Sequence, residues 1–403
     1  MTCLPGGRIR ADTEGCVRRR FVCEALTMNW LTQRFDLSRA GSGSHVRPME
    51  GLRGLAIFLV FLVHYVTLME PWIVTQSTLR SIATALHTIG NTGVDLFFVL
   101  SGYLIYGSLI TRPQRFGRFM ARRIERIYPT FAVVFVIYVG LSFLLPAQSK
   151  IPAGFSSAAG YLVENFLLLP GLFPIQPMIT VAWSLSYEMF YYLVIPAVIA
   201  LLGLRERSAV FRALFFAAIA VATAVCCALY GGPVRLIMFI SGILLFEAMN
   251  NSRLGSAPSS VAFAALAAGL LVMLLPFSGS AGYVLKVGVL FVTFFVLCHS
   301  CFSRPSAWLP RAFSWTPLRW LGNMSYSYYL IHGLALKAGV LALAVVVPPA
   351  PHGAGFFCAM MPLAFALTLL VSAALFMAVE RPFSLSQKGT PRGNSPLQQH
   401  FAP

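Results

Sequence analysis

The chain has 403 residues, of which 58% are hydrophobic and 11% are charged, and its mean hydropathy is +0.76. A soluble globular domain carries about 25% charged residues, so this composition excludes a fold that is solvated on all sides. The formal charge is +17, which in a soluble protein would indicate a nucleic-acid partner.

Continuous apolar runs of about 20 residues, without alternation of apolar and polar positions, predict membrane-spanning helices and exclude a β-barrel. We expect an all-α, polytopic membrane protein with about ten transmembrane helices at 54–70, 93–110, 128–146, 180–202, 210–230, 234–249, 260–276, 281–301, 321–346 and 356–379. The stretch 161–173 is too short to cross a bilayer and predicts a half-helix or an interfacial segment.

The positive charges gather on one side of this arrangement. With the N-terminus in the cytoplasm, the inner segments hold 25 Lys and Arg residues, whereas the outer loops hold Arg80, Lys150 and Arg235. Cytoplasmic loops of membrane proteins carry such an excess. We therefore expect a multi-pass protein with both termini cytoplasmic, and we interpret the charge as a topology signal, with no nucleic-acid partner.

The domain organisation follows from the composition of the two ends. The composition predicts a disordered basic cytoplasmic arm over residues 1–46, one transmembrane domain over 47–383 and a cytoplasmic tail over 384–403. The eight cysteines are scattered, and no His and carboxylate residues show metal-ligand spacing. We expect neither a structural disulfide nor a bound metal.

Ionisable residues inside the spans are candidate functional residues, because each costs roughly 2.5–3.5 kcal/mol at mid-membrane. Arg53 and His64 are eleven residues apart, which places them on one helix face and about 16 Å apart along the axis. They offer a cation at the mouth of a cavity and a titratable base deep inside it. An interface anchor and a packed histidine are the alternative interpretation.

The second span carries Asp95 near its outer end and the pair Ser101-Gly102 near its middle. Small residues let membrane helices approach closely. For this segment, helix packing is as good an explanation as chemistry.

An arginine stripe follows the second span. On a helical wheel, four of its arginines fall within about 80° of one another, opposite apolar residues that include Phe116 and Ile124. This pattern predicts an amphipathic helix at the cytoplasmic membrane surface. Because the guanidinium group binds phosphate with paired hydrogen bonds, the stripe suits the phosphates of coenzyme A; lipid headgroups are the alternative.

Two later spans carry further polar residues. Ser184 and Glu188 lie one turn apart in an apolar helix, where a carboxylate has to be paired, protonated or in contact with water. One face of the ninth span carries Ser325, Tyr329 and His332. The last span ends at Glu380-Arg381-Pro382, and this sequence predicts an ion pair or a helix stop at the end of the span.

Taken in order, these segments resemble the acyltransferase family 3 membrane proteins over residues 47–383. The matching pieces are EGLRGLA at 50–56 with its R-x10-H spacing from Arg53 to His64, GVDLFFVLSGYLI at 93–105, the Arg122-Arg123-x-x-Arg126-Ile-Tyr-Pro segment, WSLSYE at 183–188, LGNMSYSYYLIH at 321–332 and ERPF at 380–383. Glu50 stands where Asp is more usual in the family and keeps the charge.

The resemblance implies an acyltransferase of the bacterial cell inner membrane that O-acylates, usually O-acetylates, a carbohydrate-containing acceptor such as O-antigen, exopolysaccharide or a lipid-linked glycan. It implies acetyl-CoA or another acyl-CoA as donor, no permanently bound cofactor, and membrane lipid as surroundings. Together with the residue patterns, we expect catalysis by Arg53, His64, Ser184 and Glu188, donor binding by Arg115, Arg118, Arg122, Arg123 and Arg126, and acceptor binding by Asp95, Ser101, Trp183, Ser325, Tyr329 and His332.

We expect His64 to take the proton of the attacking hydroxyl, in one polar cavity that also holds Arg53. The sequence leaves open whether His64 is a base or carries the acyl group. The alternative function is a proton-coupled secondary transporter or a lipid-linked sugar flippase, in which the buried His and Glu relay protons. The hydropathy pattern shows no inverted repeat, which argues against transport.

Overall fold

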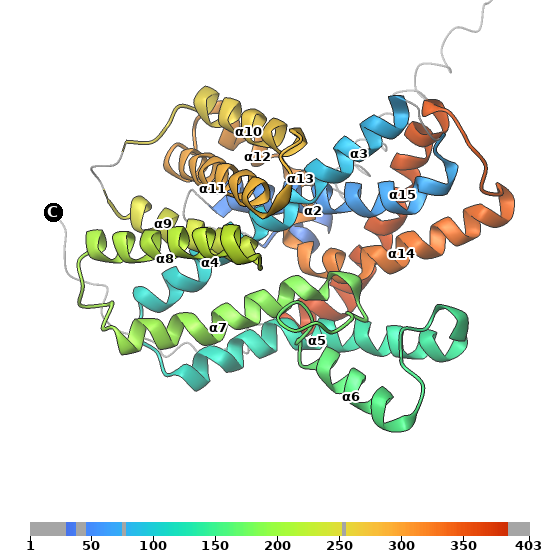
Figure 1. Cartoon of the computed structure of the whole chain (residues 1–403), viewed down its shortest axis with the longest axis horizontal. Helices are drawn as coiled ribbons and strands as arrows, with labels where there is room; N and C mark the ends of the chain where they lie inside the picture. The colour runs from blue at the N-terminus through green and yellow to red at the C-terminus, as the bar shows by residue number, and fades with distance from the viewer. Residues whose placement is uncertain (1–29, 38–45, 75–77, 252–254, 386–403) are drawn as a thin grey trace, which may run out of the picture.

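A computed structural model describes residues 30–37, 46–74, 78–251 and 255–385. Every regular element in these ranges is helical, which confirms the all-α class (Figure 1). Eight helices in the described ranges are long and apolar enough to cross a membrane by length and composition. The chain is therefore a multi-pass membrane protein.

The eight candidate spans include seven single helices and one helix pair. They are α2 (Val46–Met69), α3 (Thr78–Gly90) together with α4 (Thr92–Ile110), α5 (Phe116–Leu144), α7 (Trp183–Leu201), α8 (Ala209–Tyr230), α11 (Gly279–Ser303), α14 (Ser325–Val346) and α15 (Ala354–Leu375), which continues as a π-helix over Phe376–Ser384.

The remaining two expected spans are short helices, so a count of ten is not confirmed. They are α9 (Ile237–Met249), with 13 residues, and α10 (Ser259–Leu274), with 16 residues. At 1.5 Å per residue they measure about 20 and 24 Å, less than the roughly 30 Å of a bilayer core.

Two predicted boundaries differ from the structure. The arginine stripe is no separate surface helix, because it forms the first turns of α5, which continues through Pro129. The ninth predicted span is divided at Met324 into α13 (Thr316–Asn323) and α14, so that α14 begins inside the bundle. The segment 155–166 forms the half-helix α6 (Phe155–Phe166), whose Phe166 packs against Phe131 and Phe135 of α5.

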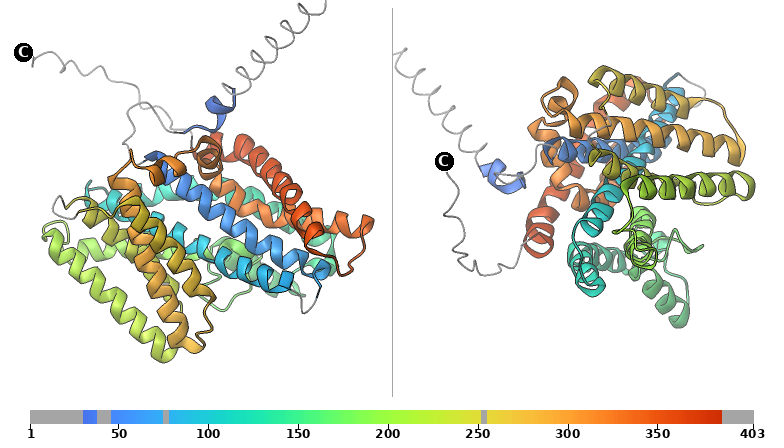
Figure 2. Two further views of the ribbon diagram at one scale, coloured as in Figure 1. Left: turned by 90° about the horizontal axis from the view of Figure 1, so that it is seen from above. Right: turned by 90° about the vertical axis from the view of Figure 1, so that its left-hand side faces the viewer.

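Helix α2 is the centre of the bundle and packs against α3, α4, α13 and α14. The pairs α10–α11 and α14–α15 flank it on different sides, while α5 and α7 run along a third (Figure 2). A Cβ atom at Gly51 would lie 1.6 Å from the carbonyl oxygen of Phe313, and one at Gly54 would lie 2.1 Å from that of Leu318. The glycines of the EGLRG segment thus let α12 (Trp308–Phe313) and α13 contact the backbone of α2.

Part of the N-terminal arm is ordered. Residues 30–35 are helical, and the buried ring of Phe35 stacks on Phe376 at 5.6 Å. Asp36 pairs with Arg319 at 2.9 Å, and Arg319 also donates to Glu50 at 2.8 Å. Residues 30–37 are therefore an exception to the predicted disorder, because they have a buried partner. The rest of the arm, except Val46, and most of the C-terminal tail lie outside the described residues.

Helices α4 and α9 cross at two glycines. A Cβ atom at Gly102 would lie 2.0 Å from the carbonyl oxygen of Phe239, and one at Gly242 would lie 2.0 Å from that of Val99. The close approach that Ser101-Gly102 predicts is confirmed for Gly102.

The substitution Gly102→Val is expected to destabilise the fold by about 1–3 kcal/mol or more, because the side chain overlaps the backbone of α9. Thermal unfolding of the detergent-purified protein measures this effect. The matched control is Gly140→Val, where a Cβ atom meets nothing within 4 Å. Equal melting temperatures for the two variants would contradict this role of Gly102.

Candidate functional site

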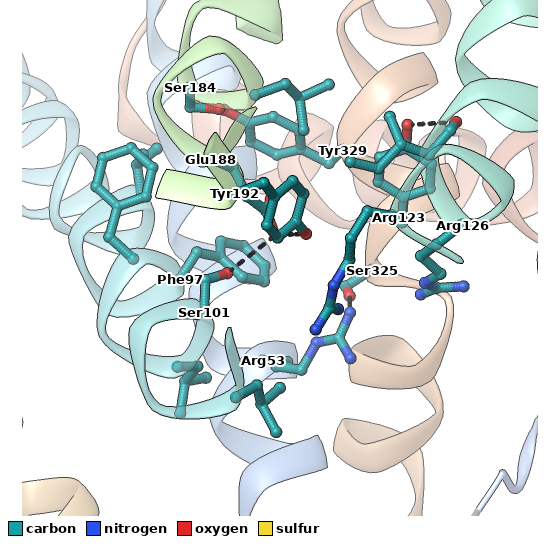
Figure 3. Close-up of a pocket in the computed structure, with 17 residues that line it drawn as sticks. Arg53, Phe97, Ser101, Arg123, Arg126, Ser184, Glu188, Tyr192, Ser325 and Tyr329 are labelled. Carbon is teal, nitrogen blue, oxygen red and sulfur yellow. Dashed lines mark hydrogen bonds between the residues drawn. The ribbon is translucent and has the colours of Figure 1, made fainter. Parts of the chain in front are cut away.

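A pocket opens between α2, α4, α5, α7 and α14 (Figure 3). Its cavity volume is about 160 Å³, below the roughly 300–1,000 Å³ of sites that enclose a drug-sized ligand, so a large ligand requires the pocket to widen. Eight of the fifteen candidate site residues line it: Arg53, Ser101, Arg123, Arg126, Ser184, Glu188, Ser325 and Tyr329. We call it the arginine pocket.

Three arginines gather at one end of the arginine pocket, away from Ser184 and Tyr329 (Figure 3). Arg53 donates from Nη2 to Oγ of Ser325, the first residue of α14, at 2.8 Å. The N-terminus of a helix carries a partial positive charge and free N–H groups. The arginines Arg53, Arg123 and Arg126 together favour an anionic group such as a phosphate, while the start of α14 is capped by Glu380.

Neighbouring side chains hold two of these arginines in place. The guanidinium of Arg123 lies 5.1 Å from the ring centre of Tyr192. Arg126 forms an ion pair with Oε1 of Glu380 at 3.0 Å, so the ion pair predicted for Glu380 is confirmed. Glu380 also accepts hydrogen bonds from N–H and Oγ–H of Ser327, at 2.9 and 2.6 Å, and thereby caps α14.

The other arginines of the stripe lie elsewhere. Arg115, Arg118 and Arg122 are exposed and do not line the arginine pocket. The helical wheel predicts a helix at the membrane surface, and the exposure of Phe116 and Ile124 (51% and 45%) agrees with an apolar face toward lipid. The wheel does not show which of the arginines meets a neighbouring helix. The face of α5 that meets the pocket carries Arg123 and Arg126 instead.

This placement predicts unequal effects of substitution within the stripe. Arg123→Gln is expected to weaken acyl-CoA affinity about 10-fold or more, because it removes a charged hydrogen-bonding group from the pocket. Arg118→Gln is expected to weaken it less than about fivefold, since exposed ion pairs contribute about 0–1 kcal/mol. Titration of the two variants in nanodiscs with acetyl-CoA measures both affinities. A larger loss of affinity in Arg118→Gln than in Arg123→Gln would contradict the placement.

The other end of the pocket is a hydroxyl and carboxylate cluster. Oγ of Ser184 lies 2.7 Å from the hydroxyl of Tyr329. Glu188 accepts from the hydroxyl of Tyr192 at 2.5 Å and from Oγ of Ser101 at 3.4 Å. Ser184 and Glu188 thus share one face of α7, as predicted, and this face lines the pocket. Tyr192, one turn after Glu188, was not among the predicted site residues.

His64 does not belong to the lining of the arginine pocket. Its ring centre lies 4.9 Å from that of His332, one turn beyond Tyr329. The prediction that Arg53 and His64 line a single cavity therefore needs correction.

The separation of Arg53 from His64 has a physical cause. Ile57 and Val60, which share their face of α2, are buried, with 0% and 3% of their surface exposed. Across the pocket, the rings of Phe97 and Tyr329 contact each other with centres 6.1 Å apart. Apolar packing and the Tyr329 ring thus close the pocket before it reaches the histidines.

Asp95 and Trp183, two of the residues expected to bind the acceptor, form a separate cluster outside the arginine pocket. Asp95 is 1% exposed and accepts from Nη2 of Arg235 at 2.9 Å. The guanidinium of Arg235 lies 5.6 Å from the ring centre of Trp183. These contacts join the first turns of α4 and α7 to the 3₁₀ turn Val234–Leu236 that precedes α9, which indicates a structural role.

A second pocket lies beyond the other side of His64. Its lining includes Thr67, one turn after His64 on α2, and the paired side chains of Glu70 and Arg80. Thr84 and His87 of α3 complete its polar lining. In the described ranges, no group of three or more His, Cys, Asp or Glu residues is placed to hold a metal ion.

Fold and site together define a multi-pass membrane protein with a cationic pocket between its helices. A sequence model of the family described as "Acyltransferase domain" matches residues 48–376. The chain therefore belongs to this acyltransferase family, as the sequence motifs predict.

Curated relatives carry related names. Peptidoglycan O-acetyltransferase OatA of Listeria monocytogenes is 28% identical over 326 residues, which are 72% of this chain and 49% of that protein. Putative peptidoglycan O-acetyltransferase YrhL of Bacillus subtilis is 28% identical over 323 residues, 72% of this chain and 48% of that protein. Acyltransferase MdmB of Streptomyces mycarofaciens is 26% identical over 322 residues, 72% of this chain and 79% of that protein.

The chain thus spans about half the length of the first two relatives. No solved structure is significantly similar to it.

Proposed function

We propose that this protein is a membrane-bound O-acyltransferase that moves an acyl group, in the first place acetyl, from acyl-CoA to a hydroxyl of a carbohydrate-containing acceptor. The observation that carries the proposal is the arginine pocket, with Arg53, Arg123 and Arg126 at one end and Ser184 and Glu188 at the other. The names of two relatives support a glycan such as peptidoglycan as acceptor.

The donor fits the distances between the residues. Arg53 and its two neighbours bind the phosphates of coenzyme A, because guanidinium groups pair with phosphate oxygens. The pantetheine arm is about as long as four to five extended peptide units. It spans the roughly 16 Å that separate Arg53 from His64 along α2, provided that the ring of Tyr329 moves aside.

The reaction needs one proton acceptor at the thioester. His64 takes the proton of the acceptor hydroxyl, and the hydroxyl oxygen attacks the thioester carbonyl carbon. The carbon–sulfur bond breaks, and the leaving thiolate takes the proton back from His64. In the other role open to His64, its ring nitrogen first accepts the acyl group, and incubation with labelled acetyl-CoA without acceptor would then leave label on the protein.

The two pockets suggest opposite approaches for the two substrates. We place both termini in the cytoplasm and the arginine end of the first pocket on the cytoplasmic side of a bacterial inner membrane, where acyl-CoA is made. The second pocket then opens on the outer side. Its Glu70, Arg80 and His87, together with Thr67 one turn after His64, offer hydrogen-bond partners to sugar hydroxyls.

Purified protein in nanodiscs tests the proposal. With acetyl-CoA and peptidoglycan fragments released by muramidase, the protein should produce free coenzyme A and O-acetylated fragments, detected by mass spectrometry. A proton-coupled transporter or flippase would release no coenzyme A. The absence of acetyl-CoA turnover with this and other envelope glycans would reject the proposal.

A further inference from the structure

A fully buried histidine, His332, lies outside both pockets and next to His64. Its side chain is 0% exposed, and it lines neither the arginine pocket nor the second pocket. The binding of an acceptor sugar, which the sequence motif predicts for His332, therefore does not suit its position. Its only imidazole neighbour among the described aromatic contacts is His64, with ring centres 4.9 Å apart.

The hydrogen bonds of His332 fix its tautomer. Its Nδ1 lies 2.8 Å from the carbonyl oxygen of Tyr328 and 2.9 Å from that of Tyr329. Because both neighbours are acceptors only, Nδ1 carries the hydrogen and Nε2 presents a lone pair. This Nε2 is a buried atom without a hydrogen-bond partner, which is rare in folded proteins.

The ring of His332 is also fixed in orientation. It stacks on Tyr328, with ring centres 5.3 Å apart and 17° between the planes. His64 is partly exposed, and the planes of the two imidazoles lie at 63°. Two imidazoles joined by an N–H···N hydrogen bond have centres about 5 Å apart. The two ring centres already lie at this separation, so a hydrogen bond between the imidazoles requires only a turn of the His64 ring.

We propose that His332 is a positioning residue for His64: its Nε2 accepts the N–H of His64 and leaves the other ring nitrogen of His64 as the base. This inference rests on the proposed function. A neutral imidazole acceptor here has the role that a carboxylate has in a catalytic triad, where it sets the tautomer and the orientation of the base. When His64 takes the proton of the hydroxyl, His332 stabilises the resulting imidazolium until the thiolate removes the proton.

Two substitutions separate positioning from packing. In His332→Gln, the side-chain oxygen is as many bonds from Cβ as Nε2 is in histidine, so an acceptor is kept at that place. In His332→Asn, the polar atoms reach only as far as Nδ1. We expect His332→Asn to lower kcat about 10- to 100-fold with little change in the KM for acetyl-CoA, and His332→Gln to stay within about threefold of the wild type. The assay is acetyl transfer from acetyl-CoA to muramidase-released peptidoglycan fragments in nanodiscs.

The matched control is His299→Asn, a buried histidine of α11 that stacks on Phe295 and lines neither pocket. It should leave kcat unchanged. Wild-type kcat in His332→Asn, or an equal loss in His332→Asn and His332→Gln, would overturn the positioning role. These outcomes test the positioning role if the wild type turns over acetyl-CoA and His64→Gln does not. A wild type without turnover would instead reject the proposed function.

Discussion

His64→Gln is expected to lower kcat for acetyl transfer by about 10²–10⁴-fold, the usual contribution of a general base. Glutamine has a similar size and keeps polar atoms next to His332, but it cannot accept a proton at neutral pH. The KM for acetyl-CoA should stay within about threefold of the wild type, because the proposed phosphate site is at the arginines and the substitution removes an interaction of the transition state alone. Initial rates at saturating donor measure the effect.

The control for this substitution is the amount and stability of the protein. His64 is partly exposed, so the variant should reach wild-type levels in the membrane and elute as the wild type does in size-exclusion chromatography. Normal acetyl transfer by His64→Gln at equal protein levels would exclude His64 from the chemistry. A loss of acetyl-CoA binding in this variant would instead assign His64 to the donor site.

Arg53→Gln is expected to lower kcat/KM for acetyl-CoA by about 10- to 100-fold, mainly through KM. Arg53 lines the arginine pocket, and the substitution removes a charged donor, whose hydrogen bonds are worth about 1.5–3 kcal/mol. The variant also loses the hydrogen bond from Arg53 to Ser325, so the start of α14 becomes less well ordered. The effect should shrink when acetyl pantetheine, which lacks the nucleotide, replaces acetyl-CoA.

Arg311→Gln is the matched control for Arg53→Gln. Arg311 lies on α12, is exposed and lines neither pocket. Its substitution should leave kcat/KM within about twofold of the wild type. If Arg53→Gln lowers the rates with acetyl-CoA and with acetyl pantetheine to the same extent, Arg53 does not recognise the phosphates.

The sequence motifs correctly predict the helical membrane class, the acyltransferase family and about half of the pocket. Arg53, Ser184 and Glu188 are found because charged and hydroxyl groups stand out in apolar helices and because helical spacing shows which of them share a face. The same rule fails for α5. Of the four arginines that share one wheel face, only Arg126 lines the pocket, beside Arg123. The neighbouring helices decide this, and the spacing does not show them.

Contacts between distant segments were beyond prediction from the sequence. The ion pair of Asp95 with Arg235 joins residues 140 positions apart, and Arg235 alone looks like an outer-loop charge. The closure of the arginine pocket by Tyr329 depends on how α14 is rotated against α4 and α7. The start of α14 inside the bundle, next to Arg53, depends on the glycine contacts between α2 and α13, which no local pattern reveals.

We propose that the arginines and His64 serve one donor molecule, although the Tyr329 ring closes the pocket between them. A cryo-EM structure of the protein with bound acetyl-CoA tests this claim most directly. We expect the phosphates at Arg53, Arg123 and Arg126, the Tyr329 ring displaced, and the thioester in contact with His64. Coenzyme A bound elsewhere, or a pantetheine arm that ends short of an undisplaced Tyr329, would contradict the claim.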